Sequence, residues 1–180
     1  MENEIYDVVV VGGGPAGSTA AEKLALSGKK VLLLDRGGRI KPCGGAIPPR
    51  LIRDYQIPDS LLVAKATSAR MVSPKNNRVD IPIENGFVGM VDRSVFDEWL
   101  RERARQKGAH RRQGSFDKLE EQGEFTKIYY RVRAKGEIGE GQLQSVLAKA
   151  VVGADGAKSS LGRAAGVPGC SEANYVFAYH

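Results

Sequence analysis

The first 36 residues combine two apolar runs with a segment of helical periodicity. The segments "YDVVVV" (6–11) and "KKVLLLD" (29–35) are short and uninterrupted, which is typical of parallel strands buried on both faces. Between them, Pro15 suits a first helical turn and Gly28 suits a C-terminal cap. The apolar face of this helix consists of Ala20, Ala21, Leu24 and Ala25. The pattern predicts a strand–helix–strand unit.

The next region is less regular. Residues 39–50, "RIKPCGGAIPPR", are rich in proline and glycine, so we expect neither helix nor strand there. The segments "SARMVS" (68–73) and "RVDIPIE" (78–84) are typical of short strands.

A helix is predicted from Ser94 to about Lys107, entered from "GFVGMVDR" and ended by Gly108. We expect Ser94 and Asp97 to form a capping pair at its start. Its buried face is predicted to consist of Phe96, Trp99, Leu100 and Ala104.

The segment after this helix alternates in the manner of half-buried strands. An antiparallel meander is predicted from "RRQGSFDKLE" (111–120), "FTKIYYRVRA" (125–134) and "GQLQSVLAKA" (141–150). We then expect a separate buried strand at "AKAVVGADG" (148–156) and a short helix near "SSLGRAAG" (159–166).

Composition sets limits on the class of protein. The chain has 180 residues, a net charge of +6 and two cysteines, Cys43 and Cys170, which fit one domain in a reducing compartment. No apolar run approaches the ~20 residues that a membrane span needs, and the N-terminus resembles no targeting peptide. We interpret "RERARQKGAHRR" (101–112) as a solvated helix face, with an anionic lipid or diphosphate site as the alternative; it lacks the interleaved aromatics of a nucleic-acid site. The strand-like end "ANYVFAYH" (173–180) leads us to expect a fragment.

The strongest chemical signal is G-x-G-x-x-G at the junction of the first strand and helix. Gly12 permits the tight turn, Gly14 lets a diphosphate approach the backbone, and Gly17 lets helix and strand pack closely. With Pro15 and Ala16, they form a helix N-terminus whose N–H groups and partial positive charge favour phosphates. The motif predicts a dinucleotide site.

The end of the second strand supplies a sugar ligand. Asp35 stands near the expected ~20 residues beyond the glycines, where a carboxylate accepts hydrogen bonds from the adenosine ribose and repels a 2′-phosphate. We therefore expect FAD or NAD to bind there in preference to NADP, and count Arg36 with the same site.

Further segments resemble those of flavoproteins. "VVGADGAKSSLGR" is similar to the "GADG" segment of FAD enzymes of the aromatic-hydroxylase type, which implies that Asp155 and Gly156 lie near the flavin diphosphate. In the same superfamily an arginine in the setting of Arg93 reaches the FAD. The resemblance also implies that Phe116 lies where the backbone meets the adenine.

Together with "KPCGGAIPPRLI" and "FVGMVDRSVFDEWLRERA", these segments resemble the geranylgeranyl reductase family, above all its chlorophyll and bacteriochlorophyll branch. The resemblance implies an FAD enzyme that reduces geranylgeranyl double bonds to a phytyl chain with electrons from NADPH. The substrate would be geranylgeranylated chlorophyll or bacteriochlorophyll, or geranylgeranyl diphosphate. Asp35 departs from the glutamate more common in the wider superfamily, although either residue serves as ribose acceptor.

The implied fold is α/β: a Rossmann-like FAD-binding domain of the aromatic-hydroxylase and glutathione-reductase-like type, with an antiparallel β-meander insertion and the C-terminal part missing. We divide residues 1–180 into a nucleotide-binding unit (1–36), a flavin-facing loop with the start of the substrate region (37–93), and a helix, meander and GADG segment (94–166). The implied location is the cytoplasm, with peripheral contact on a photosynthetic membrane because the substrate is apolar.

The family match places Cys43 close to the flavin. Small residues at Gly44, Gly45 and Ala46 would let backbone N–H groups lie against the ring. A thiol with the reference pKa of ~8.5 is mostly protonated at neutral pH, so Cys43 either donates a proton to the alkene, shapes the site, or packs with no chemical part. Cys170 matches no functional position.

Two other functions compete. An FAD-dependent aromatic-hydroxylase-type monooxygenase would use the same scaffold, although the "KPCGG" loop argues against it. A non-catalytic fragment is the other, because the chain has no later "GD"-type segment for the flavin ribitol and diphosphate.

Overall fold

The computed structural model describes residues 4–37, 43–84, 86–133 and 139–172. Two compact units divide the chain. One is made of Met1–Arg39 and Asp97–Phe177, and the other of Ile40–Phe96 with Ala178–His180.

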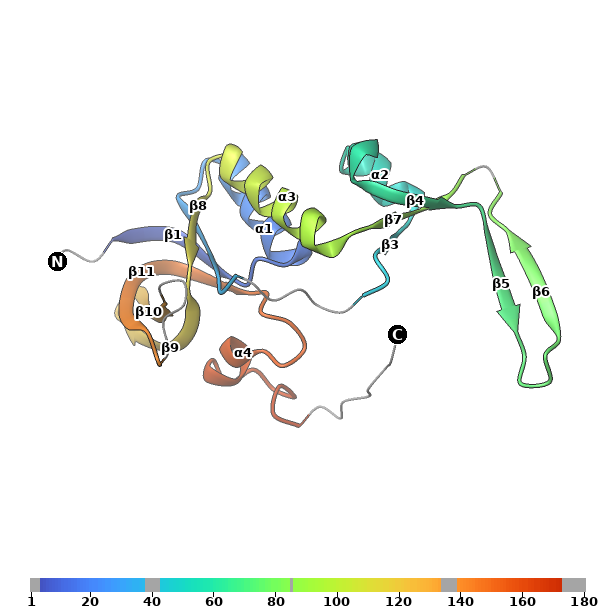
Figure 1. Cartoon of the computed structure of the whole chain (residues 1–180). Helices are drawn as coiled ribbons and strands as arrows, with labels where there is room; N and C mark the ends of the chain where they lie inside the picture. The colour runs from blue at the N-terminus through green and yellow to red at the C-terminus, as the bar shows by residue number, and fades with distance from the viewer. Residues whose placement is uncertain (1–3, 38–42, 85, 134–138, 173–180) are drawn as a thin grey trace. The chain divides into compact units, whose positions relative to one another are not determined.

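The first unit contains a six-stranded sheet in the order β8-β2-β1-β11-β10-β9 (Figure 1). β1 (Ile5–Val11) lies between β2 (Val31–Asp35) and β11 (Gln142–Gly153), and is parallel to both. α1 (Pro15–Leu26) connects β1 to β2, which confirms the predicted strand–helix–strand unit. The remaining strands are β8 (His110–Gln113), β9 (Ser115–Gln122) and β10 (Phe125–Val132).

The meander differs from the prediction at both ends. The expected strands at 141–150 and 148–156 are one strand, β11, whose first half is antiparallel to β10 and whose second half is parallel to β1. No glycine or proline interrupts the chain between Gln142 and Val152, so nothing ends the strand there.

The expected strand at 111–120 is instead two strands. β8 pairs in parallel with β2, and β9 pairs antiparallel with β10. Gly114 separates them, and a Cβ at this position would lie 2.7 Å from the Tyr130 ring. The glycine therefore lets the chain pass closely over the sheet as it turns from one partner to the next.

Each face of the parallel strands has its own core. On one face Val8, Val10, Val31 and Leu33 pack with Ala21 of α1 and with Ala104 and Ala109. On the other face the buried side chains come from the strands and from Leu161 of α4 (Ser160–Ala164); they are Tyr6, Val9, Val11, Leu32, Leu34, Ile128, Tyr130, Val146 and Ala148. Coverage on both faces explains why the runs in β1 and β2 are uninterrupted.

Both long helices have well-defined ends. Gly28, at φ +79°, closes α1 with its N–H donating to the Ala25 carbonyl, while the Lys29 N–H donates to Leu24. α3 (Arg93–Gln106) begins one residue earlier than predicted, and its cap is Asp92, whose carboxylate accepts from the Ser94 N–H at 2.8 Å and the Ser94 hydroxyl at 2.6 Å. The predicted Ser94–Asp97 capping pair is therefore wrong, because Ser94 already lies inside the helix. These bonds lower the pKa of Asp92, the Ser94 hydroxyl contributing most.

The basic segment 101–112 is the predicted solvated face only in part, because Arg101 and Arg103 are each 14% exposed whereas Arg105 is 58% exposed. Its arginines are paired with carboxylates: Arg101 and Arg111 with Glu98, Arg103 with Glu22, Arg105 with Glu102, and Arg112 with Glu4. Glu102 lies within the segment. The other acids lie in the preceding helical turn (Glu98), on α1 (Glu22) and before β1 (Glu4), so the segment's own residues do not reveal them. Along the described ranges, no helix has the length and apolar character needed to cross a membrane.

The second unit has more regular structure than predicted. Of the predicted loop at 39–50, residues 39–42 lie outside the described residues. The rest is not an unbroken loop, because Ala46–Ile47 form β3 and α2 (Pro49–Asp54) begins within it; a proline is tolerated at the first position of a helix. β3 and β4 (Leu62–Ala66) flank β7 (Val88–Val91) in a three-stranded sheet, and a short helix, η1 (Asp59–Leu61), precedes β4. The two strands predicted from 68 to 84 are confirmed as the hairpin of β5 (Ser68–Val72) and β6 (Arg78–Pro82).

Candidate functional site

The turn between β1 and α1 is built on two glycines that packing requires. Gly12 has φ +105°, and a Cβ there would lie 2.3 Å from the Ala154 carbonyl oxygen. A Cβ at Gly17 would lie 1.8 Å from the Gly12 oxygen. Both contacts are with backbone, which cannot move aside cheaply, so these positions keep the turn tight against β11 and the helix close to the turn.

Gly14 has the opposite environment. It is the N-cap residue of α1, at φ −73°, and a Cβ built there meets nothing within 4 Å. The N–H groups of Ala16 and Gly17 lie in the first helical turn, where no helical carbonyl precedes them, and Pro15 has no N–H. The turn therefore leaves open space at Gly14 beside backbone donors and the positive end of a helix dipole, which suits a diphosphate.

Asp35, at the end of β2, is held beside this turn. Its Oδ2 accepts from the Gly13 N–H at 2.7 Å, and its Oδ1 accepts from the Gly37 N–H at 2.9 Å. Its side chain is 18% exposed, and a guanidinium nitrogen of Arg101 lies 3.8 Å from Oδ1. Each carboxylate oxygen accepts more than one hydrogen bond, so an exposed edge remains for ribose hydroxyls. These residues fit the ADP part of a dinucleotide; Arg36 is exposed next to them.

Two neighbours of Asp35 were missed from the sequence. Arg101 belongs to the run interpreted as solvated, and only its spacing of three from Glu98 hinted at an ordered pair. Gln113 lies opposite Asp35 in the β2–β8 pairing, and its side-chain amide donates to the Arg36 carbonyl at 3.4 Å. Neither could be placed beside Asp35 without knowing that β8 joins the parallel sheet.

The GADG segment places Asp155 at the start of α4. The Asp155 carboxylate accepts from the Ser159 hydroxyl at 2.5 Å, the Ser160 N–H at 2.7 Å and the Leu161 N–H at 3.1 Å. It therefore fixes the turn that follows β11. Gly156 has φ +92° and open space where a Cβ would be. Their predicted role at the flavin diphosphate stays a prediction.

The predicted adenine contact falls on β9. Phe116 pairs with Tyr130 across β9 and β10, and its side chain packs against the core that contains Tyr130. The backbone that reaches Asp35 from this segment is that of Gly114, whose N–H donates to the Asp35 carbonyl at 2.9 Å. A role for Phe116 at the adenine stays a prediction.

The remaining predicted site residues lie in the second unit or at its boundary. Cys43 is exposed, and a Cβ at Gly44 would meet nothing within 4 Å. Gly45 is needed within the unit itself, because it has φ +73° and a Cβ there would lie 2.0 Å from the Val91 oxygen. Ala46 pairs with Met90 in β3. Arg93, the first residue of α3, is half-buried. The predicted contact of these residues with a flavin stays a prediction.

Comparison with known proteins identifies relatives along the whole described fold. A family model described as "FAD binding domain" matches residues 5–178. Geranylgeranyl diphosphate reductase of Rhodobacter capsulatus is 57% identical over 175 residues, which cover 97% of this chain and 43% of that protein. The chloroplastic geranylgeranyl diphosphate reductase of Arabidopsis thaliana is 37% identical over 170 residues, 91% of this chain and 36% of that protein.

A solved structure gives the same result for the fold. The crystal structure of a geranylgeranyl bacteriochlorophyll reductase-like protein from Thermoplasma acidophilum matches with a TM-score of 0.80 and 28% identity, over 93% of this chain and 43% of that one. The chain thus spans less than half the length of these relatives. The predicted FAD-binding α/β fold and the resemblance to geranylgeranyl reductases are confirmed. This chain belongs to the FAD binding domain family.

Proposed function

We propose that this chain supplies the FAD-binding part of a reductase. The enzyme reduces isolated double bonds of a geranylgeranyl chain, which turns it into a phytyl chain. The observation that carries this proposal is the 57% identity to a geranylgeranyl diphosphate reductase over 97% of the chain. The open turn at Gly14 and the accessible edge of Asp35 support it, because they fit the ADP part of FAD.

The residues of the first unit bind and orient the FAD. The first-turn N–H groups of α1 hold the diphosphate, and Asp35 accepts hydrogen bonds from the adenosine ribose. When bound, FAD supplies the hydride for the reduction. We assign the electrons that regenerate it to NADPH, on the strength of the family resemblance.

The loop at Cys43 either delivers a proton to the substrate or only shapes the reaction site. An isolated alkene has no carbonyl to receive negative charge, so an acid must deliver a proton to one carbon as the hydride reaches the other. Cys43 is exposed, with open space beside Gly44, which suits either a proton donor or a wall of the reaction site. Asp155 and Arg93 are assigned to the diphosphate and the flavin, and Phe116 to the adenine.

The substrate is geranylgeranyl diphosphate or a geranylgeranylated pigment of the chlorophyll type. The names of the two curated relatives above support the diphosphate, and that of the archaeal structure supports the pigment. Because either substrate carries a long apolar chain, we assign the enzyme to the membrane surface as a peripheral protein.

A chimera tests the proposal. The matching 175 residues of the Rhodobacter capsulatus relative are replaced by this chain, and the product is incubated with FAD, NADPH and each substrate. We expect a yellow protein that NADPH bleaches without oxygen, and a product whose mass rises by that of a hydrogen pair for each double bond. A colourless chimera, or one that consumes oxygen and hydroxylates an aromatic compound, would contradict it.

Cysteine variants of the same chimera separate the roles of Cys43. If Cys43 donates the proton, Cys43→Ala lowers kcat by roughly 10²–10⁴-fold. If it only shapes the site, kcat stays within about tenfold. Cys170→Ala is the matched control, because Cys170 lines, with Leu161 and Val167, an apolar pocket of about 380 Å³ in the first unit.

A further inference from the structure

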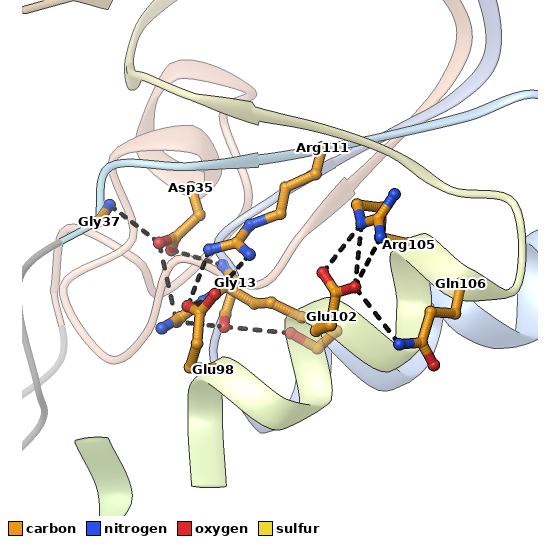
Figure 2. A network of polar contacts seen from close by, with 10 residues as sticks. Gly13, Asp35, Gly37, Glu98, Glu102, Arg105, Gln106 and Arg111 are labelled. Atoms are coloured by element: carbon orange, nitrogen blue, oxygen red, sulfur yellow. Dashed lines mark hydrogen bonds and ion pairs between the residues drawn. The ribbon is translucent and has the colours of Figure 1, made fainter. Parts of the chain in front are cut away.

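Charged side chains from α3 and β8 converge on the turn after β1, and the family assignment does not account for them (Figure 2). Arg101 lies at the centre of this group. Its Nη1 donates to the Gly13 carbonyl oxygen at 3.0 Å and lies 3.8 Å from Asp35 Oδ1. The Arg101 side chain is only 14% exposed. A guanidinium on α3 thus contacts the turn and stands beside the carboxylate assigned to the ribose.

A second ion pair fixes the orientation of Arg101. Arg101 Nε donates to Glu98 Oε2 at 2.9 Å, and both oxygens of Glu98 accept from Arg111 of β8, at 2.6 and 2.8 Å (Figure 2). The guanidinium of Arg111 lowers the pKa of Glu98, so the carboxylate stays charged at neutral pH. Because a guanidinium is planar, a bond at Nε constrains the direction in which Nη1 points.

Asp35 and Gly13 are also joined by a hydrogen bond. The Gly13 N–H donates to Asp35, so the turn and the carboxylate are coupled directly. The Gly13 carbonyl accepts from Arg101 at 3.0 Å and from the Ser18 hydroxyl of α1 at 3.1 Å. The other Asp35 oxygen accepts from the Gly37 N–H, where the chain leaves β2. Arg101 therefore acts on the turn and on the carboxylate together, from an element 88 residues away in the chain.

We propose that Arg101 is a positioning residue, which holds the Gly13 turn and the Asp35 carboxylate in the geometry that binds the ADP part of FAD. This inference rests on the proposed FAD site and adds a residue outside its motifs. Charge-assisted hydrogen bonds are about twice as strong as neutral ones, and the low exposure of Arg101 limits competition from water. Loss of the guanidinium removes the cation that lies 3.8 Å from Asp35, and leaves Glu98 paired with Arg111.

The same helix offers a matched control. Arg105 forms an equivalent pair with Glu102, three residues before it, at 2.7 Å (Figure 2). The Arg105 side chain is 58% exposed, and its partner Glu102 lies on α3 itself. Arg105→Met therefore removes a similar charge and a similar i, i+3 pair without touching the turn.

The test uses ADP, which carries the diphosphate and adenosine ribose of FAD, and amide hydrogen exchange on the purified chain. We expect Arg101→Met to raise the Kd for ADP about tenfold and to speed exchange at the Gly13 and Gly37 amides about tenfold, since a hydrogen bond to a charged group is lost. Arg105→Met should stay within about twofold on both measures. Arg101→Lys keeps the charge but has no planar fork, so it should raise the Kd for ADP and speed the amide exchange by about threefold.

A double variant shows whether Arg101 works through the carboxylate. If Arg101 positions Asp35, Arg101→Met adds little to Asp35→Asn, and the double variant binds ADP about as weakly as Asp35→Asn alone. Additive losses would overturn the inference, as would unchanged exchange at Gly13 and Gly37 in a folded Arg101→Met, or equal losses in Arg105→Met. If Arg101→Met does not fold, Arg101→Lys is tested by the same two measurements. An Arg101→Lys chain with the ADP affinity and amide exchange of the wild type would overturn the inference. A wild-type chain that binds no ADP refutes the proposed FAD site, while the amide exchange still decides the role of Arg101.

Discussion

The strands of the nucleotide-binding sheet and the β5–β6 hairpin both carry large apolar side chains, but these lie in opposite environments. Val9, Val10 and Leu33 are fully buried, with side chains packed on both faces of β1 and β2. In the hairpin, Met71 and Val79 lie opposite each other and are each 61% exposed. An apolar residue in a strand therefore predicts the strand, whereas its burial depends on the elements that the rest of the chain brings to each face.

The hairpin owes its order to pairing across its two strands. On one face Ala69 pairs with Ile81 and Met71 with Val79, and on the other Arg70 forms a bidentate pair with Asp80, at 2.6 and 2.9 Å. Cross-strand pairs of this kind contribute roughly 0.2–1 kcal/mol each. The first unit instead gains its stability from buried area, so equal substitutions in the two regions should have unequal effects.

The largest difference is expected from truncating an apolar side chain in each region. Leu33→Ala should lower the free energy of unfolding by about 3 kcal/mol, because Leu33 is fully buried between β1, α1 and α3. Met71→Ala should lower it by less than about 0.5 kcal/mol, because the side chain is largely in water. Urea unfolding monitored by circular dichroism gives both values. Similar losses would show that the hairpin is covered in solution.

Two glycines of the turn should differ in how much the fold depends on them. Gly17→Ala should cost about 2.5 kcal/mol, because its Cβ would collide with the Gly12 oxygen. Gly14→Ala should cost only about 0.5 kcal/mol, because its Cβ enters open space and alanine is merely a poorer N-cap than glycine. Thermal unfolding of both variants checks this order; equal destabilisation would contradict the close approach at Gly17.

Removing one ion-pair partner in each region should give a smaller contrast. Arg103 and Glu22 join α3 to α1 at 2.6 Å, with side chains 14% and 9% exposed. Arg103→Met should cost about 2 kcal/mol, because it leaves Glu22 charged and nearly buried. Arg70→Met in the hairpin should cost under about 1 kcal/mol, because that pair is exposed on both sides. Chemical denaturation is the measurement, and a larger loss for Arg70→Met would contradict the comparison.

The smallest effect concerns pH. The pKa of Glu98 is lowered in the folded chain, chiefly by Arg111, so its stabilisation is present above the unfolded pKa near 4.5 and is lost as the pH falls through the folded pKa. Since half of the side chain is exposed, we expect only a few tenths of a kcal/mol. Wild type and Glu98→Gln should therefore differ at pH 6 and converge near pH 3 in urea titrations. A difference that grows on acidification would contradict the sign.

Much of the first unit could be predicted from sequence because its signals are local. The apolar runs, the glycine spacing and Pro15 each determine structure within a few residues, and they gave β1, α1 and β2 correctly. The errors concern long-range pairing: β11 was divided in two, and β8 was merged with β9. Which strand a segment pairs with depends on residues far along the chain, and no local pattern records it.

The same distinction applies to the site. A motif spans Gly12, Gly14, Gly17 and Asp35, so their convergence at one turn could be predicted, while their role in binding FAD stays a prediction. Arg101 could not be placed beside this turn, because its acceptor Gly13 is 88 residues away in the chain. The predicted Ser94–Asp97 cap failed for a different reason. Asp92, two residues before Ser94, caps α3, and Asp92 and Ser94 both fit the same local rule for an N-cap.

The central claim is that the turn after β1, with Asp35, binds the ADP part of FAD. Isothermal titration of FAD into the purified chain tests it most directly, with Gly14→Ala as the comparison at matched thermal stability. The account predicts saturable, equimolar binding at micromolar FAD by the wild type and its loss in Gly14→Ala, where a methyl group occupies the space for the diphosphate. A wild-type chain that takes up no FAD, or a Gly14→Ala chain that binds it equally well, would contradict the account.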